Sequence, residues 1–163
     1  DVGTGSGAIA VVLARHLPDA RITSIDVSEK ALAIARENAA RNAVSERVRL
    51  LKGDLLEPVS GEQFDLVVSN PPYVPLGDRE SLSVEVRDFE PALALFAGAD
   101  GLDVYRRLIP VAYAVLASGG YILLEIGYGQ AETVRTLLAA SGFEGIYFVP
   151  DLQRIPRVAC GRR

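Results

Sequence analysis

The chain has 163 residues, 49% of them apolar, and its formal net charge is −4, which fits one domain and excludes a disordered chain. The clearest apolar runs, residues 8–14 and 111–117, are seven residues long, whereas a membrane span needs about 20, so we expect a soluble chain without a membrane partner. With one cysteine, Cys160, and an acidic balance of charges, we expect no internal disulfide, no metal site and no bulk electrostatic binding of nucleic acid.

The first part of the chain alternates between helical and extended patterns. Helices are expected at residues 7–16 and 28–42, and strands at residues 21–26, 48–52 and 64–69. Ser28 is placed as the N-cap of the second helix. Asp1 is interpreted as the end of a strand that begins outside this sequence, so we expect the chain to be part of a longer protein.

The pattern breaks for 32 residues between Asn70 and Gly101, and a break of that length is functional or contains short elements. A helix follows at residues 103–117, where Pro110 predicts a kink or a break and residues 118–120 (SGG) predict the end. The remaining elements are a strand at residues 121–126, a helix at 130–141 with Gly142 after it, and strands at 145–150 and 157–160. This order predicts an α/β sandwich with a mainly parallel sheet and an antiparallel pair at its end.

A glycine-rich loop precedes the first helix, in the sequence DVGTGSG at residues 1–7. Alternate glycines let a backbone turn tightly and lie against a ligand, while the helix start offers free N–H groups. The spacing differs from the dinucleotide fingerprint, in which two residues separate the second and third glycines. Asp26, nineteen residues past Gly7, ends the next strand and can accept both hydroxyls of a ribose. Together these features predict a cofactor that contains adenosine.

The second motif is Ser69-Asn70-Pro71-Pro72-Tyr73, at the carboxyl end of an apolar strand, where open α/β sheets bind ligands. The Asn70 oxygen and the Pro71 carbonyl can each accept one N–H of an amino group. Tyr73 can lie flat on the planar group that carries this nitrogen. A proline-rich turn with a capping asparagine is the competing interpretation.

These motifs resemble the class I methyltransferases that use S-adenosylmethionine, and in particular the release-factor glutamine methyltransferases of the HemK/PrmC family. The segment VRDFEPALAL at residues 86–95, the segment LLEIG at 123–127 and the end of the chain are also similar to that family. The resemblance implies a Rossmann-like sandwich with a mainly parallel seven-stranded sheet, an antiparallel last strand and a truncated first strand. It further implies one methyltransferase domain over residues 1–163, without the helical N-terminal substrate domain of the family.

The resemblance also assigns residues to the cofactor S-adenosylmethionine. The implied cofactor-binding residues are Gly3, Thr4, Gly5, Ser6, Gly7, Asp26, Val27, Asp54, Leu55 and Asn70. Asp54 would accept from the adenine amino group, with Val27 and Leu55 on the ring. Asn70, Pro71 and Tyr73 are the implied catalytic residues, and together with Pro72 they would hold the glutamine side chain.

The implied reaction is methyl transfer to N5 of a protein glutamine, in the Gly-Gly-Gln loop of a peptide chain release factor. The alternatives are a glutamine of a ribosomal protein, amino-methylation of a nucleic-acid base, and a dinucleotide-binding module without methyl chemistry. We expect a cytoplasmic monomer. Outside the two motifs, His16 is interpreted as structural or merely exposed, and Cys160 as a small buried hydrophobic residue. Arg87 and Glu90 are interpreted as a solvated ion pair or as residues that order the loop, and Glu125 as a core or cleft carboxylate.

Overall fold

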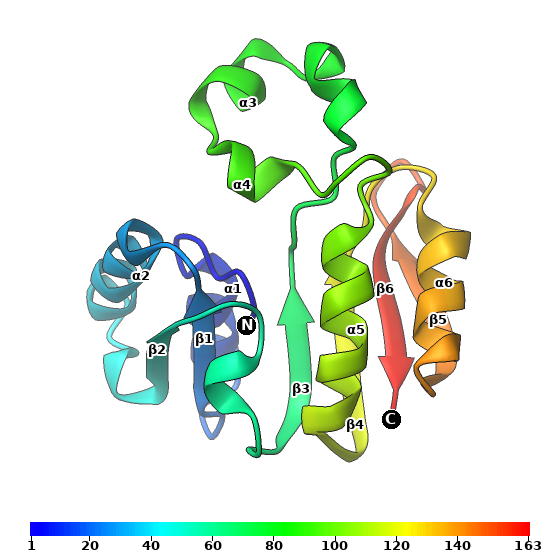
Figure 1. The fold of residues 1–163 in the computed structure, drawn as a ribbon. Helices are drawn as coiled ribbons and strands as arrows, with labels where there is room; N and C mark the ends of the chain where they lie inside the picture. Colours follow the sequence, from blue (N-terminus) through cyan, green and yellow to red (C-terminus); the bar gives the residue numbers. More distant parts are fainter. The chain divides into compact units, whose positions relative to one another are not determined.

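A computed structural model describes all residues 1–163, which form two compact units. The first comprises Asp1–Glu62 and Val67–Ser69, and the second comprises Gln63–Leu66 and Asn70–Arg163. The molecule is an α/β protein with six strands, and Figure 1 labels its elements along the chain. None of the helices combines the length and the apolar character needed to cross a bilayer.

The first unit packs helices against a parallel pair of strands. Its elements are α1 (Ala8–His16), β1 (Ile22–Asp26), α2 (Glu29–Arg41), the 3-10 helices η1 (Ser45–Arg47) and η2 (Glu57–Val59), β2 (Val48–Lys52) and the end of β3 (Phe64–Ser69). As predicted, Ser28 caps α2, because its Oγ accepts from the Ala31 N–H at 3.3 Å. Leu32, Ala35 and Ala39 form the buried face of that helix.

Val2 forms parallel bridges with Ile25 of β1 and with Ser69 of β3. The Ser69 hydroxyl, which is buried, donates to the Val2 carbonyl at 2.7 Å. Val2 is therefore extended backbone between two strands, in agreement with the interpretation of Asp1 as the end of a strand. These contacts hold the glycine loop at the carboxyl ends of β1 and β3.

The second unit contains a four-stranded sheet in the order β3-β4-β6-β5, in which β6 pairs antiparallel with both β4 and β5. Its other elements are η3 (Leu76–Ser81), α3 (Val84–Phe89), α4 (Ala92–Leu95), α5 (Asp103–Val115), β4 (Leu116–Glu125), α6 (Ala131–Ala140), β5 (Glu144–Pro150) and β6 (Pro156–Arg162). The predicted break at residues 70–101 is therefore a run of short helices. The expected closing antiparallel pair is confirmed as β5 and β6.

The expected break in α5 and the expected place of its end were wrong, whereas the kink expected at Pro110 stays a prediction. The helix continues through Pro110 without a break, because the proline lies on the exposed side while Ile109 and Ala112 are buried. Proline has no N–H, so the carbonyl one turn earlier in the helix has no helical partner. On the exposed side that carbonyl can be hydrated. Residues 118–120 do not form a loop but lie inside β4, which begins at Leu116. The end of the chain pairs with them: the Gly119 N–H donates to the Arg163 carbonyl at 2.8 Å, and the Arg163 N–H donates to the Gly120 carbonyl at 2.9 Å.

Candidate functional site

The glycine loop has the conformation that its composition predicts. Gly3, Gly5 and Gly7 have φ angles of 67°, 54° and 78°, in the left-handed region that favours glycine. A Cβ atom on Gly7 would lie 2.9 Å from the Ala35 Cβ, so a larger residue would push the loop away from α2. A Cβ on Gly3 or Gly5 would meet nothing within 4 Å, which leaves the backbone there open to a ligand.

Asp26 and the glycine loop are brought together, as the sequence predicted. One carboxylate oxygen accepts from the Gly5 N–H at 2.8 Å, and the other accepts from the Ser28 N–H at 2.8 Å. The Gly3 and Thr4 N–H groups both donate to the Ile25 carbonyl, at 2.8 and 3.0 Å. The hydrogen bonds from Gly5 and Ser28 hold the Asp26 carboxylate in place. Each of its oxygens has more than one lone pair, so the carboxylate can still accept from a hydroxyl group of a ligand.

The other loop positions serve mainly to shape the loop. Thr4 is buried and donates its hydroxyl to the Asp1 carboxylate at 2.5 Å. The Ser6 carbonyl accepts from the Asn38 side chain at 2.9 Å, which ties the loop to α2. The second carboxylate oxygen of Asp1 is buried and has no hydrogen-bond partner.

The predicted adenine residues follow the two parallel strands of the first unit. Asp26 pairs with Lys52 in the β1–β2 register, and the Gly53 N–H donates to the Asp26 carbonyl at 3.1 Å. Val27 is apolar and 43% exposed. Leu55 has a φ of 50°, a left-handed conformation that is unfavourable for a side chain of this size. Strained residues of this kind are found preferentially at ligand sites.

Residues 70–73 belong to the second unit, whereas Ser69, at the end of β3, belongs to the first. Asn70 is exposed, Pro71 is buried, and Pro72 and Tyr73 are half-buried. The Tyr73 hydroxyl donates to Glu125 Oε1 at 3.1 Å, and burial together with this carboxylate raises the pKa of Tyr73. The hydroxyl of Tyr105 donates to the Glu125 carbonyl at 2.7 Å. Glu125, for which the sequence left two interpretations open, thus fixes the ring of Tyr73.

Backbone hydrogen bonds join the two ends of the segment at residues 70–101, and we call this joined part the base of the segment. The Val74 N–H donates to the Leu95 carbonyl at 2.8 Å, and the Ala97 N–H donates to the Val74 carbonyl at 3.0 Å. The Leu76 N–H donates to the Gly98 carbonyl at 2.9 Å. The backbone itself therefore closes the segment before it leads into α5.

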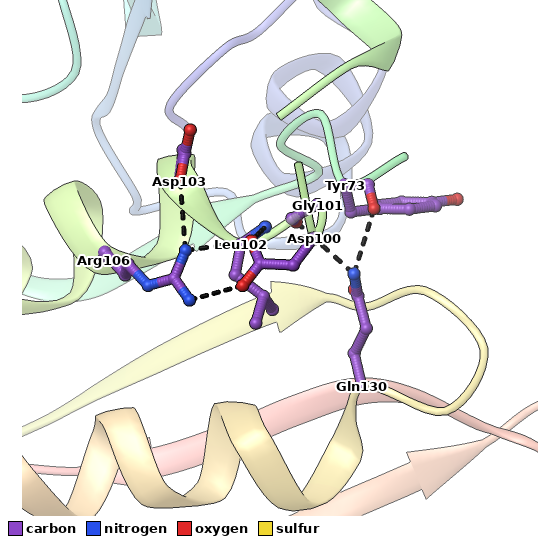
Figure 2. Close-up of polar contacts among 7 residues, drawn as sticks. All are labelled: Tyr73, Asp100, Gly101, Leu102, Asp103, Arg106 and Gln130. Carbon is purple, nitrogen blue, oxygen red and sulfur yellow. Dashed lines mark hydrogen bonds and ion pairs between the residues drawn. The ribbon is translucent and has the colours of Figure 1, made fainter. Parts of the chain in front are cut away.

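Polar side chains reinforce this base (Figure 2). Arg106 of α5 binds Asp100 with both terminal nitrogens, at 2.9 and 2.5 Å, and also contacts Asp103 at 3.1 Å. These hydrogen bonds raise the pKa of Arg106 and lower that of Asp100. The Leu102 N–H donates to the same Asp100 carboxylate at 3.2 Å, so the chain is fixed where α5 begins.

Sequence reasoning missed Gln130, which was assigned only as the start of a helix. Its amide nitrogen lies 3.0 Å from the Tyr73 carbonyl oxygen and 3.4 Å from that of Gly101, as Figure 2 shows. The only signal in the sequence is a glutamine placed between a glycine turn and a helix, and that signal does not identify its distant partners.

The structure also places the residues that the sequence singled out beyond the two motifs. His16 is exposed at the end of α1 and Cys160 is buried in β6, as expected. The expected pair of Arg87 and Glu90 needs correction, because the Arg87 guanidinium forms its ion pairs with Glu80 and Asp88, at 3.5 and 2.9 Å. Those partners lie on the same segment, so the pairs contribute to its local order.

Comparisons with known proteins agree with the motifs. A family model, "Methyltransferase small domain", matches residues 1–90. The release factor glutamine methyltransferase of Geobacter sulfurreducens is 46% identical over 162 residues, which are 99% of this chain and 56% of that protein. The one of Moorella thermoacetica is 49% identical over 152 residues, or 93% of this chain and 53% of that protein. The chain spans about half the length of the curated relatives it matches, and the resemblance stated from the motifs is confirmed.

A solved structure supports the fold. The ribosomal protein L11 methylase from Lactobacillus delbrueckii subsp. bulgaricus is similar with a TM-score of 0.72 and 26% identity. The match covers 100% of this chain and 68% of the other. The α/β class that the sequence predicted is therefore confirmed.

Proposed function

The chain belongs to the methyltransferase small domain family, and on that premise we propose that it transfers a methyl group from S-adenosylmethionine to N5 of a protein glutamine. The acceptor is the Gly-Gly-Gln glutamine of a peptide chain release factor. The observation that carries this proposal is the similarity to release factor glutamine methyltransferases over nearly the whole chain. S-adenosylmethionine is the cofactor that this family implies.

The first unit supplies the cofactor residues in this proposal. Gly3, Gly5 and Gly7 offer an open backbone surface, and Asp26 accepts from the ribose hydroxyls. The remaining proposed contacts are those of Thr4 and Ser6 through the backbone, Val27 and Leu55 on the adenine, and Asp54 with its amino group.

Residues 70–73 hold the acceptor amide. The Asn70 side-chain oxygen and the Pro71 carbonyl each accept one amide N–H, Pro72 keeps the backbone stiff, and Tyr73 lies against the amide plane. When bound, S-adenosylmethionine supplies an electrophilic methyl group on a sulfonium. An amide nitrogen is a weak nucleophile because its lone pair is delocalised, so two acceptors on its hydrogens orient it and enrich it in electrons.

Asn70 and Pro71 would hold the amide nitrogen with its lone pair toward the methyl group, for which the sulfonium would be the leaving group. The methylated nitrogen would then release one proton to water. Because this loss follows methyl transfer, no strong base is required among the residues near Tyr73. Glu125 is already engaged by the Tyr73 hydroxyl, which fits a role in holding the ring.

We also propose the domain organisation, the localisation and the oligomeric state of the protein. Residues 1–163 act as one methyltransferase domain with a seven-stranded, mainly parallel sheet, to which the strand that ends near Val2 contributes. The protein works in the cytoplasm as a monomer and does not bind nucleic acid, in line with its net charge of −4.

Transfer of labelled methyl to a purified release factor tests this function. The full-length protein that contains this chain is incubated with methyl-labelled S-adenosylmethionine and the release factor, and a release factor with the loop glutamine replaced by alanine is the control. We expect label on the first factor and none on the second. Label on the alanine variant, or only on a ribosomal protein or an RNA offered in parallel, would contradict the proposal.

A further inference from the structure

The side-chain amide of Gln130 joins three segments of the second unit. Its Oε1 accepts from the Gly127 N–H at 2.9 Å, three residues away. Its Nε2 donates to the Tyr73 carbonyl, 57 residues away, and to the Gly101 carbonyl, 29 residues away. In Figure 2 this amide points at the two carbonyls from the start of α6. One side chain thus connects both ends of the long segment to the turn between β4 and α6.

Tyr73 is held at both of its ends by residues that flank this turn. Gln130, after the turn, binds its carbonyl, and Glu125, before the turn, binds its hydroxyl. Two contacts at opposite ends of one residue fix both its backbone and the direction of its ring. The turn therefore determines where Tyr73 lies.

Glycines leave the space that this amide occupies. A Cβ on Gly101 would lie 2.2 Å from the Tyr73 carbonyl oxygen and 2.9 Å from Gln130 Nε2. A Cβ on Gly127 would lie 2.8 Å from Gln130 Oε1 and 3.0 Å from the Tyr73 ring. Gln130 thus fits a space that any side chain at either position would close.

We propose that Gln130 is a positioning residue for methyl transfer, acting through the Tyr73 carbonyl to hold Asn70 and Pro71 in line for the acceptor amide. The prolines at 71 and 72 transmit this constraint, because their φ angles are fixed and few torsions remain between Tyr73 and Asn70. Gln130 itself does not touch the acceptor. This inference rests on the proposed function of residues 70–73.

Two variants of Gln130 test the inference in the full-length protein. Gln130→Glu keeps an oxygen for the Gly127 N–H but turns a second oxygen toward two carbonyls, and Gln130→Met has a similar length without hydrogen bonds. We expect either variant to lower kcat on a release factor by about 10- to 100-fold, the effect of a small misplacement of reacting groups. The Kd for S-adenosylmethionine should stay at the wild-type value, and KM for the release factor should change less than kcat.

Gln153 offers the matched control, because it is exposed in the turn between β5 and β6. The same substitutions there should leave kcat unchanged. Gln130 variants that turn over like the Gln153 controls, or that lose cofactor affinity by the same factor as kcat, would overturn the positioning role. Gln130→Met decides the question if Gln130→Glu does not fold. Failure of the wild-type protein to methylate the release factor would instead refute the proposed function itself.

Discussion

The glycine loop and the segment at residues 70–101 are held in place by different kinds of contact. The loop takes its conformation from three glycines and closes on itself, with the Gly7 N–H bonded to the Thr4 carbonyl at 2.9 Å. The base of the segment depends on side chains much farther along the chain, including Gln130 and Glu125. Hydrogen bonds to other elements hold both regions, but the glycine φ angles set the shape of the first, whereas the second also needs side chains from far along the chain.

This difference implies that the two regions can be disturbed separately. Substitutions in the first unit should act on cofactor affinity, whereas substitutions around residues 70–101 should act on turnover. Variants that change both quantities together would argue against this division.

The largest effect is expected at Asn70. Asn70→Ala removes one acceptor for the substrate amide and should lower kcat by about 10²–10³, or roughly 2.7–4 kcal/mol. Asn70→Asp should be nearly as damaging. The added carboxylate would stabilise the positively charged sulfonium before reaction, and methyl transfer removes that charge. The measurement is kcat on a release factor together with the cofactor Kd. Wild-type turnover in the alanine variant would leave the proline-rich turn as the better interpretation.

A smaller loss, in affinity rather than turnover, is expected at Asp26. Asp26→Ala removes a charged acceptor for the ribose and should weaken S-adenosylmethionine binding by about 1.5–3 kcal/mol. Calorimetry measures this change, with the exposed Asp19→Ala as the control. Equal affinities in the two variants would remove Asp26 from the cofactor site.

The base of the long segment can be probed with two glycines that share a left-handed backbone conformation. Gly101 and Gly145 have φ angles of 75° and 57°, but only a Cβ on Gly101 meets other atoms within 4 Å. Gly101→Ala should therefore lower the free energy of unfolding by about 1–3 kcal/mol more than Gly145→Ala, the cost of overpacking. Chemical denaturation compares the two variants. Equal losses would show that the space around Gly101 adapts.

The mildest test concerns motion, since it changes no residue. In the free protein, residues 70–101 should be the long stretch with the fastest amide exchange, because its short helices have few buried apolar side chains. Within it, the bonded amides of Val74, Leu76 and Ala97 should exchange more slowly than those of α3. Added substrate peptide should slow exchange throughout the segment. Uniformly slow exchange before addition would contradict this expectation.

Local chemistry explains which features the sequence could predict. The bounds of β2 and β3, the Ser28 cap and the turn at residues 1–7 follow from side-chain pattern, capping and glycine spacing, so they were predicted correctly. The start of β4 was missed because Gly119 and Gly120 pair with the last residue of the chain. Gln130 was missed for the same reason, since its partners are set by the fold and not by its neighbours.

The position of the transferred methyl group decides whether the protein methylates a glutamine amide. After reaction of the full-length protein with a release factor and S-adenosylmethionine, fragmentation mass spectrometry of the Gly-Gly-Gln peptide locates the modification. We expect one methyl group on the side-chain amide nitrogen of the glutamine, and none when Asn70→Ala replaces the wild-type protein for the same short time. A methyl group on an amine or hydroxyl of the release factor, or only on an RNA base, would contradict it.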